Sequence, residues 1–230
     1  MKTRLNPWIV TTATLVLGLT AILTKPMAQA GGNSNPRVRP PNSRPYGLTY
    51  TDWEVRWADW LFSIPSDENP LADPDGRFCQ VGQSGPVFFL GSNFGGTSVR
   101  SCTVPAGKSL LFTPAGFIGL LTVDADTEEG LRAAVQAGVD AITNIAADVD
   151  GVPIKDLDRY RVLSPLSTFT LPADNVFGLA AGDYQYILEG FFFLLAPPAV
   201  GEHVIHLHDE FPVGISDVTY NITVAPRGAD

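Results

Sequence analysis

Short apolar runs bounded by glycine and proline fill most of this chain beyond residue 78, and they restrict the fold to short strands joined by turns. The run Phe88-Phe89-Leu90, for example, lies between Gly85-Pro86 and Gly91. Nearer the C-terminus, apolar and polar residues alternate over residues 218–224, which is typical of a strand with one buried face. These patterns predict a mainly β fold.

Two segments instead have helical spacing of their apolar residues. The first, about residues 51–62, is predicted to begin at a capping box of Thr51 and Glu54. The second, about residues 127–148, is predicted to begin at a cap on Thr127 and carries an apolar stripe of Leu131, Val135, Val139, Ile142 and Ile145.

Three tryptophans lie on one face of the first predicted helix, namely Trp53, Trp57 and Trp60. Such a stripe either docks a helix on a core or binds sugar rings. Docking is the favoured interpretation, because each indole buries a large area.

The two strand regions flank the second helix, and neither is self-sufficient. We therefore predict a single β-rich domain over residues 48–230, β-sandwich-like and largely antiparallel, with two helices. Residues 31–47 hold four prolines and three arginines and no acidic residue, so they are predicted to form an extended basic linker.

The N-terminus has the three parts of a secretory signal. Lys2 and Arg4 precede an apolar stretch over residues 8–23, and Ala28-Gln29-Ala30 is a cleavage signal. Residues 1–30 are therefore predicted to be a signal peptide that is cut between Ala30 and Gly31. The apolar stretch is shorter than the roughly 20 residues of a spanning helix, which argues against the competing interpretation of an uncleaved membrane anchor. No stable membrane anchor is expected after cleavage, and the protein is predicted to be secreted or periplasmic.

The chain is acidic, with a formal net charge of −9. Loss of three basic residues with the signal would leave a mature charge of about −12. A surface of this charge repels the phosphates of nucleic acid and anionic lipid. DNA and RNA are therefore excluded as expected partners.

Cys79 and Cys102 are the two cysteines of the chain. In an exported protein an even pair predicts a disulfide. The loop that it closes, about 24 residues, would contribute roughly 3 kcal/mol of stability. The competing interpretation, a metal pair or a reactive thiol, lacks the usual C-x-x-C spacing.

Motifs that could carry chemistry are incomplete. Ala106-Gly107-Lys108-Ser109 lacks the first glycine of a phosphate-binding loop, and Ser84 has no nucleophile-elbow sequence around it. Asp73 and Asp75 offer oxygen ligands for calcium, but a turn at Pro74 and Gly76 explains them better.

The three histidines cluster at His203, His206 and His208. On a strand, His206 and His208 share one face, and His203 shares the other with Ile205 and Leu207. Two histidines at this spacing suit a metal site, with Asp209, Glu210 or a distant carboxylate as third ligand. A divalent metal held by His206, His208 and Asp209 is therefore the alternative hypothesis, and a solvated strand end with no cofactor is the competing one.

Motifs along most of residues 50–224 resemble a family of secreted bacterial proteins without an assigned activity. The specific part is the block that begins at Cys79 and continues through Gly82-Gln83, Gly85-Pro86-Val87, Arg100, Cys102 and Val104-Pro105-Ala106-Gly107-Lys108. The resemblance implies export, one disulfide and a β-rich fold, and it implies no catalytic residue. This chain departs from the pattern at Phe88, where such proteins often have tryptophan.

The sequence thus favours a non-enzymatic binding or surface module outside the cytoplasm. Its expected partner is a small molecule, a glycan or a protein. An exposed aromatic strip at residues 191–193 would support that hypothesis. The alternative is a metal-binding protein or metal-dependent enzyme that uses His206 and His208.

Overall fold

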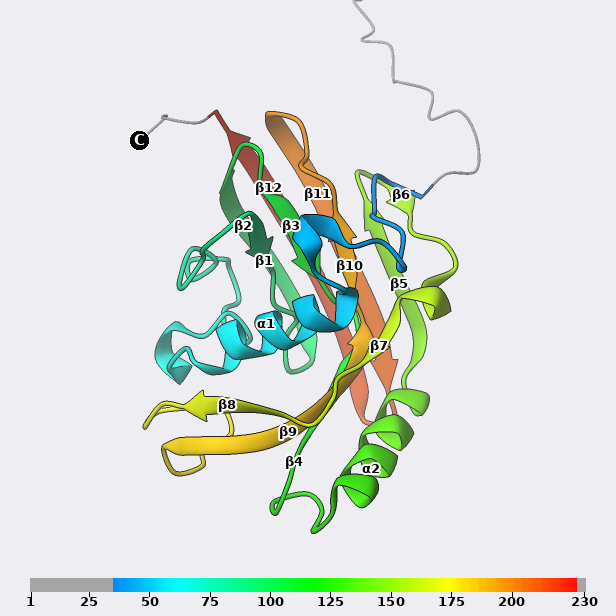
Figure 1. The fold of residues 1–230 in the computed structure, drawn as a ribbon. Helices are drawn as coiled ribbons and strands as arrows, with labels where there is room; N and C mark the ends of the chain where they lie inside the picture. The colour runs from blue at the N-terminus through cyan, green and yellow to red at the C-terminus, as the bar shows by residue number, and fades with distance from the viewer. Residues whose placement is uncertain (1–34, 227–230) are drawn as a thin grey trace, which may run out of the picture. The chain divides into compact units, whose positions relative to one another are not determined.

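A computed structural model describes residues 35–226, in which twelve strands and two α-helices follow one another (Figure 1). The prediction of a mainly β, mostly antiparallel fold with two helices is confirmed. The predicted signal peptide and its cleavage site lie outside the described residues. None of the described helices is long and apolar enough to cross a membrane.

The largest sheet has the strand order β2-β12-β11-β5-β6. Its strands are β2 (Gly96–Pro105), β5 (Thr143–Val149), β6 (Val152–Pro153), β11 (Gly201–Phe211) and β12 (Gly214–Ala225). Strands β11 and β12 form a hairpin, and β2 runs parallel to β12. Alternate residues of β12 are buried, as the period-two pattern of residues 218–224 predicts.

The other strands form two smaller sheets. One has the order β1 (Val87–Phe89), β3 (Ser109–Phe112) and β10 (Phe193–Leu195). The other has the order β4 (Gly116–Leu120), β9 (Gly182–Phe191) and β7 (Arg161–Leu163), and β8 (Ser167–Leu171) also pairs with β9. Residues 191–193, whose exposure would have supported a binding surface, are buried, because they join β9 to β10 inside the core.

Helix α1 (Tyr50–Phe62) is capped at Thr49, two residues before the predicted cap. Its capping box joins Thr49 and Asp52. The predicted box of Thr51 and Glu54 is wrong, because Glu54 lies on the buried face of the helix.

The tryptophan stripe docks α1 on the core. Trp53, Trp57 and Trp60 are buried. Their indole N–H groups donate to carbonyl oxygens of three different segments, at Pro45, Leu90 and Val81 respectively. The docking interpretation is confirmed, and these bonds fix the rotation of the helix about its axis.

Helix α2 (Glu128–Asp140) begins after Thr127 as predicted but ends at Asp140. The prediction of helix to residue 148 is wrong, because Thr143–Val149 form β5 and pair with β11. Ile142 and Ile145 match the helical spacing by coincidence, and tertiary pairing overrides it.

The described part of the predicted linker packs on the domain. Val38 forms a β-bridge with Leu195 of β10, the Arg39 N–H donates to the Leu194 carbonyl, and the Tyr50 hydroxyl donates to the Arg39 carbonyl at 2.6 Å. Residues 37–39 therefore pair with β10 at the edge of the small β1-β3-β10 sheet.

Candidate functional site

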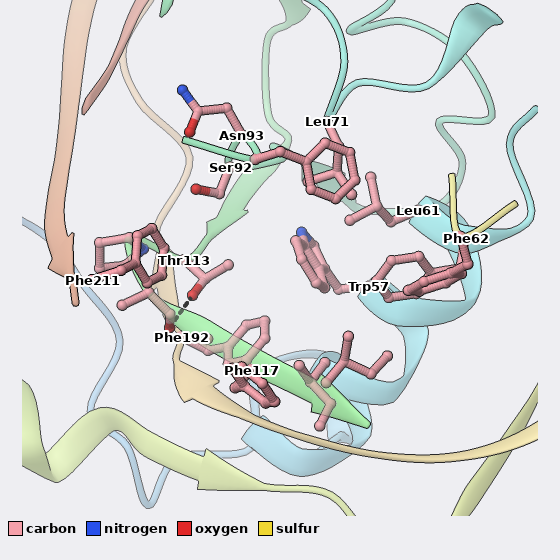
Figure 2. Close-up of a pocket in the computed structure, with 17 residues that line it drawn as sticks. Trp57, Leu61, Phe62, Leu71, Ser92, Asn93, Thr113, Phe117, Phe192 and Phe211 are labelled. Atoms are coloured by element: carbon pink, nitrogen blue, oxygen red, sulfur yellow. Dashed lines mark hydrogen bonds between the residues drawn. The ribbon is translucent and has the colours of Figure 1, made fainter. Parts of the chain in front are cut away.

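An apolar pocket of about 260 Å³ lies beside α1. Figure 2 shows its walls. They come from α1, from the loops before β2 and β4, and from β4, β9, β10 and β11 or their flanks. The lining residues are Trp57, Leu61, Phe62, Leu71, Ser92, Asn93, Phe94, Thr113, Pro114, Ala115, Gly116, Phe117, Ile118, Phe177, Leu188, Phe192 and Phe211. Enclosed apolar space with a few polar groups is the usual form of a small-molecule site.

One wall is the core-facing side of α1. Trp57 and Leu61 are four residues apart and so lie on the same side of the helix. The Trp57 indole donates to the Leu90 carbonyl at 2.9 Å and meets the Phe192 ring edge-on, with centroids 5.4 Å apart. This wall is therefore fixed before any ligand arrives.

The polar groups gather on the opposite side of the pocket (Figure 2). They belong to Ser92, Asn93 and Thr113. The Asn93 amide donates to the Gly96 carbonyl and to the Ser98 hydroxyl, each at 3.1 Å. These bonds fix the loop before β2. Ser92, Asn93 and Thr113 are called the polar end of the pocket below.

Arg100 holds this polar end from inside the protein. It is 1% exposed, and one guanidinium nitrogen donates to the Gly91 and Ser92 carbonyls and approaches the Tyr220 hydroxyl. Its Nε donates to the Asp73 carbonyl at 2.6 Å. In the sequence, Arg100 stood out only as one residue of the resemblance stated above. An arginine at an inward position of a strand is the signal that could have identified it as a buried residue that holds neighbouring loops.

Two phenylalanines lie at the exposed mouth of the pocket. Phe94 is 65% and Phe117 is 44% exposed. The Phe117 ring lies against Gly138 of α2, where a Cβ would be 2.6 Å from the ring. Gly138 therefore gives Phe117 the space it needs.

Asp209 is a buried carboxyl behind the polar end. It is opposite Ser216 in the β11–β12 register, and the Ser216 hydroxyl lies 3.4 Å from that of Ser92. Neither Asp209 oxygen has a partner at hydrogen-bonding geometry within the described residues. Burial raises the pKa of Asp209 to about 6, which the Ser216 hydroxyl opposes only in part.

Glu54 of α1 is a second buried acid. It also lacks a hydrogen-bond partner within the described residues. Burial, together with the nearby charge of Glu189, raises its pKa well above the ordinary value of 4.5. Glu189 itself is held by Arg161 at 2.8 Å.

The histidines lie on the main sheet as the alternation predicted. His206 and His208 are half-buried on the outer face, whereas Ile205 and Leu207 point inward. The carboxylate of Asp217 lies 3.2 Å from His206 Nε2 and 3.0 Å from His208 Nδ1. Burial opposes ionisation of Asp217, but the two histidines outweigh it and lower its pKa.

Asp209 does not join these histidines, because it occupies an inward position of β11. The proposed ligand set of His206, His208 and Asp209 is therefore divided between the two faces of the sheet. The carboxylates that do meet the two histidines are Asp148, Asp217 and, at 3.8 Å from His208, Glu210. Among residues 35–226, no group of three or more His, Cys, Asp or Glu side chains has an arrangement that could hold a metal ion.

The remaining sequence candidates have structural roles. His203 bridges Asp150 and the Ala199 carbonyl. The Asp73 carboxylate accepts backbone N–H bonds from Asp75, Gly76 and Phe78, which is the turn expected there instead of a calcium site.

The sequence motif that begins at Cys79 builds the turn before β1. Cys79 and Cys102 form the predicted disulfide. The Gln83 side chain spans the same turn, accepting from the Phe89 N–H and donating to the Cys79 and Phe89 carbonyls. The motif therefore fixes the segment that leads into β1.

No protein-family model matches this chain, and no curated protein matches it. Among solved structures, it is similar to that of PbICP-C in complex with falcipain-2, at 11% identity and a TM-score of 0.25, over 61% of this chain and 100% of that one. It is also similar to the solution structure of amebosin, at 12% identity and a TM-score of 0.18, over 56% of this chain and 96% of that one. Likeness at this level does not assign the chain to a family.

Proposed function

We propose that this protein is a non-enzymatic binding protein that holds a small, largely apolar molecule in the pocket beside α1. The observation that carries the proposal is the pocket itself, with about 260 Å³ of space between Trp57, Phe192 and the loop of Ser92. A space of this size, lined by apolar side chains and ending in a few polar groups, is suited to a ligand.

The proposed place of action is outside the cytoplasm. The secretory signal at residues 1–30 supports export, and so does the disulfide, since such bonds persist in oxidising compartments. The resemblance of the Cys79–Lys108 motif to secreted bacterial proteins supports it further. We propose that the mature protein begins at Gly31 and is secreted or periplasmic.

The test is binding of small phenyl compounds to the purified exported protein, measured by calorimetry. We expect saturable binding of at least one of phenethyl alcohol and propylbenzene. Leu71→Trp replaces an aliphatic lining residue by a bulky indole ring and is expected to abolish binding. The matched control is Val200→Trp. Val200 is 58% exposed and lies just before the first residue of β11, whereas the pocket residue Phe211 is the last residue of that strand.

Absence of binding by the unmodified protein, or equal binding by Leu71→Trp and Val200→Trp, would overturn the proposal. A circular-dichroism spectrum of each variant shows whether the fold is retained. If Leu71→Trp does not fold, Ile118→Trp provides the same obstruction from β4.

A further inference from the structure

Building on the proposed function, we infer that the ligand is a small neutral alcohol, with an aromatic or aliphatic body and a hydroxyl directed at Ser92, Asn93 and Thr113. An engineered cavity of about 150 Å³ accepts benzene. By that measure the 260 Å³ pocket accommodates roughly ten non-hydrogen atoms.

The absence of charge among the described lining residues requires a neutral ligand. None of the 17 residues is acidic or basic. An ionised ligand would lose its hydration and gain no opposite charge at the wall, which is strongly unfavourable.

The hydrogen bonds already made at the polar end of the pocket favour a ligand that donates a hydrogen bond. The Thr113 hydroxyl already donates its hydrogen to the Ala115 carbonyl at 2.9 Å, so its oxygen can only accept from a ligand. Both N–H bonds of the Asn93 amide are committed to Gly96 and Ser98. Its carbonyl oxygen accepts from the Gly95 N–H at 2.9 Å and keeps a second lone pair for a ligand donor.

Ser92 completes the polar end with the least committed group. Its hydroxyl has one long contact, 3.4 Å to Ser216, and so can accept or donate. The three side chains together therefore present mainly acceptors. A ligand hydroxyl can donate to one of these acceptors and can also accept from Ser92, whereas a ketone or an ether can only accept.

Four compounds with the same phenyl body separate the alternatives. They are phenethyl alcohol, propylbenzene, phenylacetate and phenethylamine, which differ in carrying a hydroxyl, a methyl, a carboxylate and an ammonium group. By calorimetry we expect the alcohol to bind best, propylbenzene roughly tenfold more weakly, and the two ions roughly a hundredfold or more weakly.

The outcomes distinguish this inference from the proposed function. Equal affinity for propylbenzene and the alcohol, or tighter binding of either ion, overturns the inference while the binding function stands. Absence of binding by all four overturns both.

Variants of the polar end give an independent check. Thr113→Val keeps the shape of the side chain and removes the acceptor. It is therefore expected to weaken binding of the alcohol roughly tenfold and to leave the affinity for propylbenzene unchanged. Thr113→Ser is the matched control and should restore alcohol binding. Equal weakening of both compounds by Thr113→Val contradicts the inference. If that variant does not fold, Ser92→Ala is expected to show the same selective loss.

Discussion

Replacing Asp209 by asparagine should remove a pH-dependent cost that is built into the main sheet. The carboxyl is fully buried, and its pKa is raised from 3.8 to about 6. Between these values the folded protein binds a proton that the unfolded chain does not. Stability therefore falls as the pH rises from about 4 to about 6, and the loss is complete above that window. A shift of this size corresponds to about 3 kcal/mol.

The assay is urea denaturation of the original protein and of Asp209→Asn at several values from about pH 4 to about pH 7.5. Asparagine stays neutral, so the stability of the variant relative to the original should rise by about 3 kcal/mol across this range. Any constant effect of the amide cancels in that comparison. Asp217→Asn is the matched control, because the pKa of Asp217 is lowered and its own titration therefore falls below the pH range of the assay. Parallel stability curves for Asp209→Asn and the original protein would refute the reasoning.

Three further predictions concern the pocket and its support. Replacing Cys79 and Cys102 by alanine opens a loop of about 24 residues and should cost roughly 3 kcal/mol in urea denaturation; an unchanged midpoint would contradict this. Arg100→Met leaves buried carbonyls without donors and should cost ~3 kcal/mol or more by the same measurement, and Arg100→Lys should fail to restore it, because an ammonium cannot reproduce the guanidinium fork. Gly138→Ala must displace the Phe117 ring, so calorimetry should show several-fold weaker ligand binding with little loss of helix stability; unchanged affinity would show that Phe117 does not shape the site.

Local sequence patterns predicted strands and helix starts best where the apolar residues of the pattern are the ones that the fold buries. The alternation over residues 218–224 sets which side chains of β12 face the core, and Thr127 caps α2. Where two patterns compete, tertiary contacts decide. Thr49-Asp52 and Thr51-Glu54 both have cap spacing, and only burial of Glu54 against the core selects the first.

The site was less accessible to sequence reasoning, because its walls come from segments far apart in the chain. Trp57, Ser92 and Phe192 have no shared motif, and each resembles an ordinary core or loop residue. The period-two rule correctly placed His206 and His208 on one face. The same rule puts Asp209 on the other face, so counting residues along the strand was sufficient to reject it as their partner.

The most direct test of the binding proposal is a crystal structure of the protein with para-bromophenethyl alcohol, located by the anomalous signal of bromine. The proposal predicts one strong bromine peak inside the pocket, near the Trp57 and Phe192 rings, with the hydroxyl toward Ser92 and Thr113. Bromine peaks confined to the protein surface, with no density in the pocket, would contradict it.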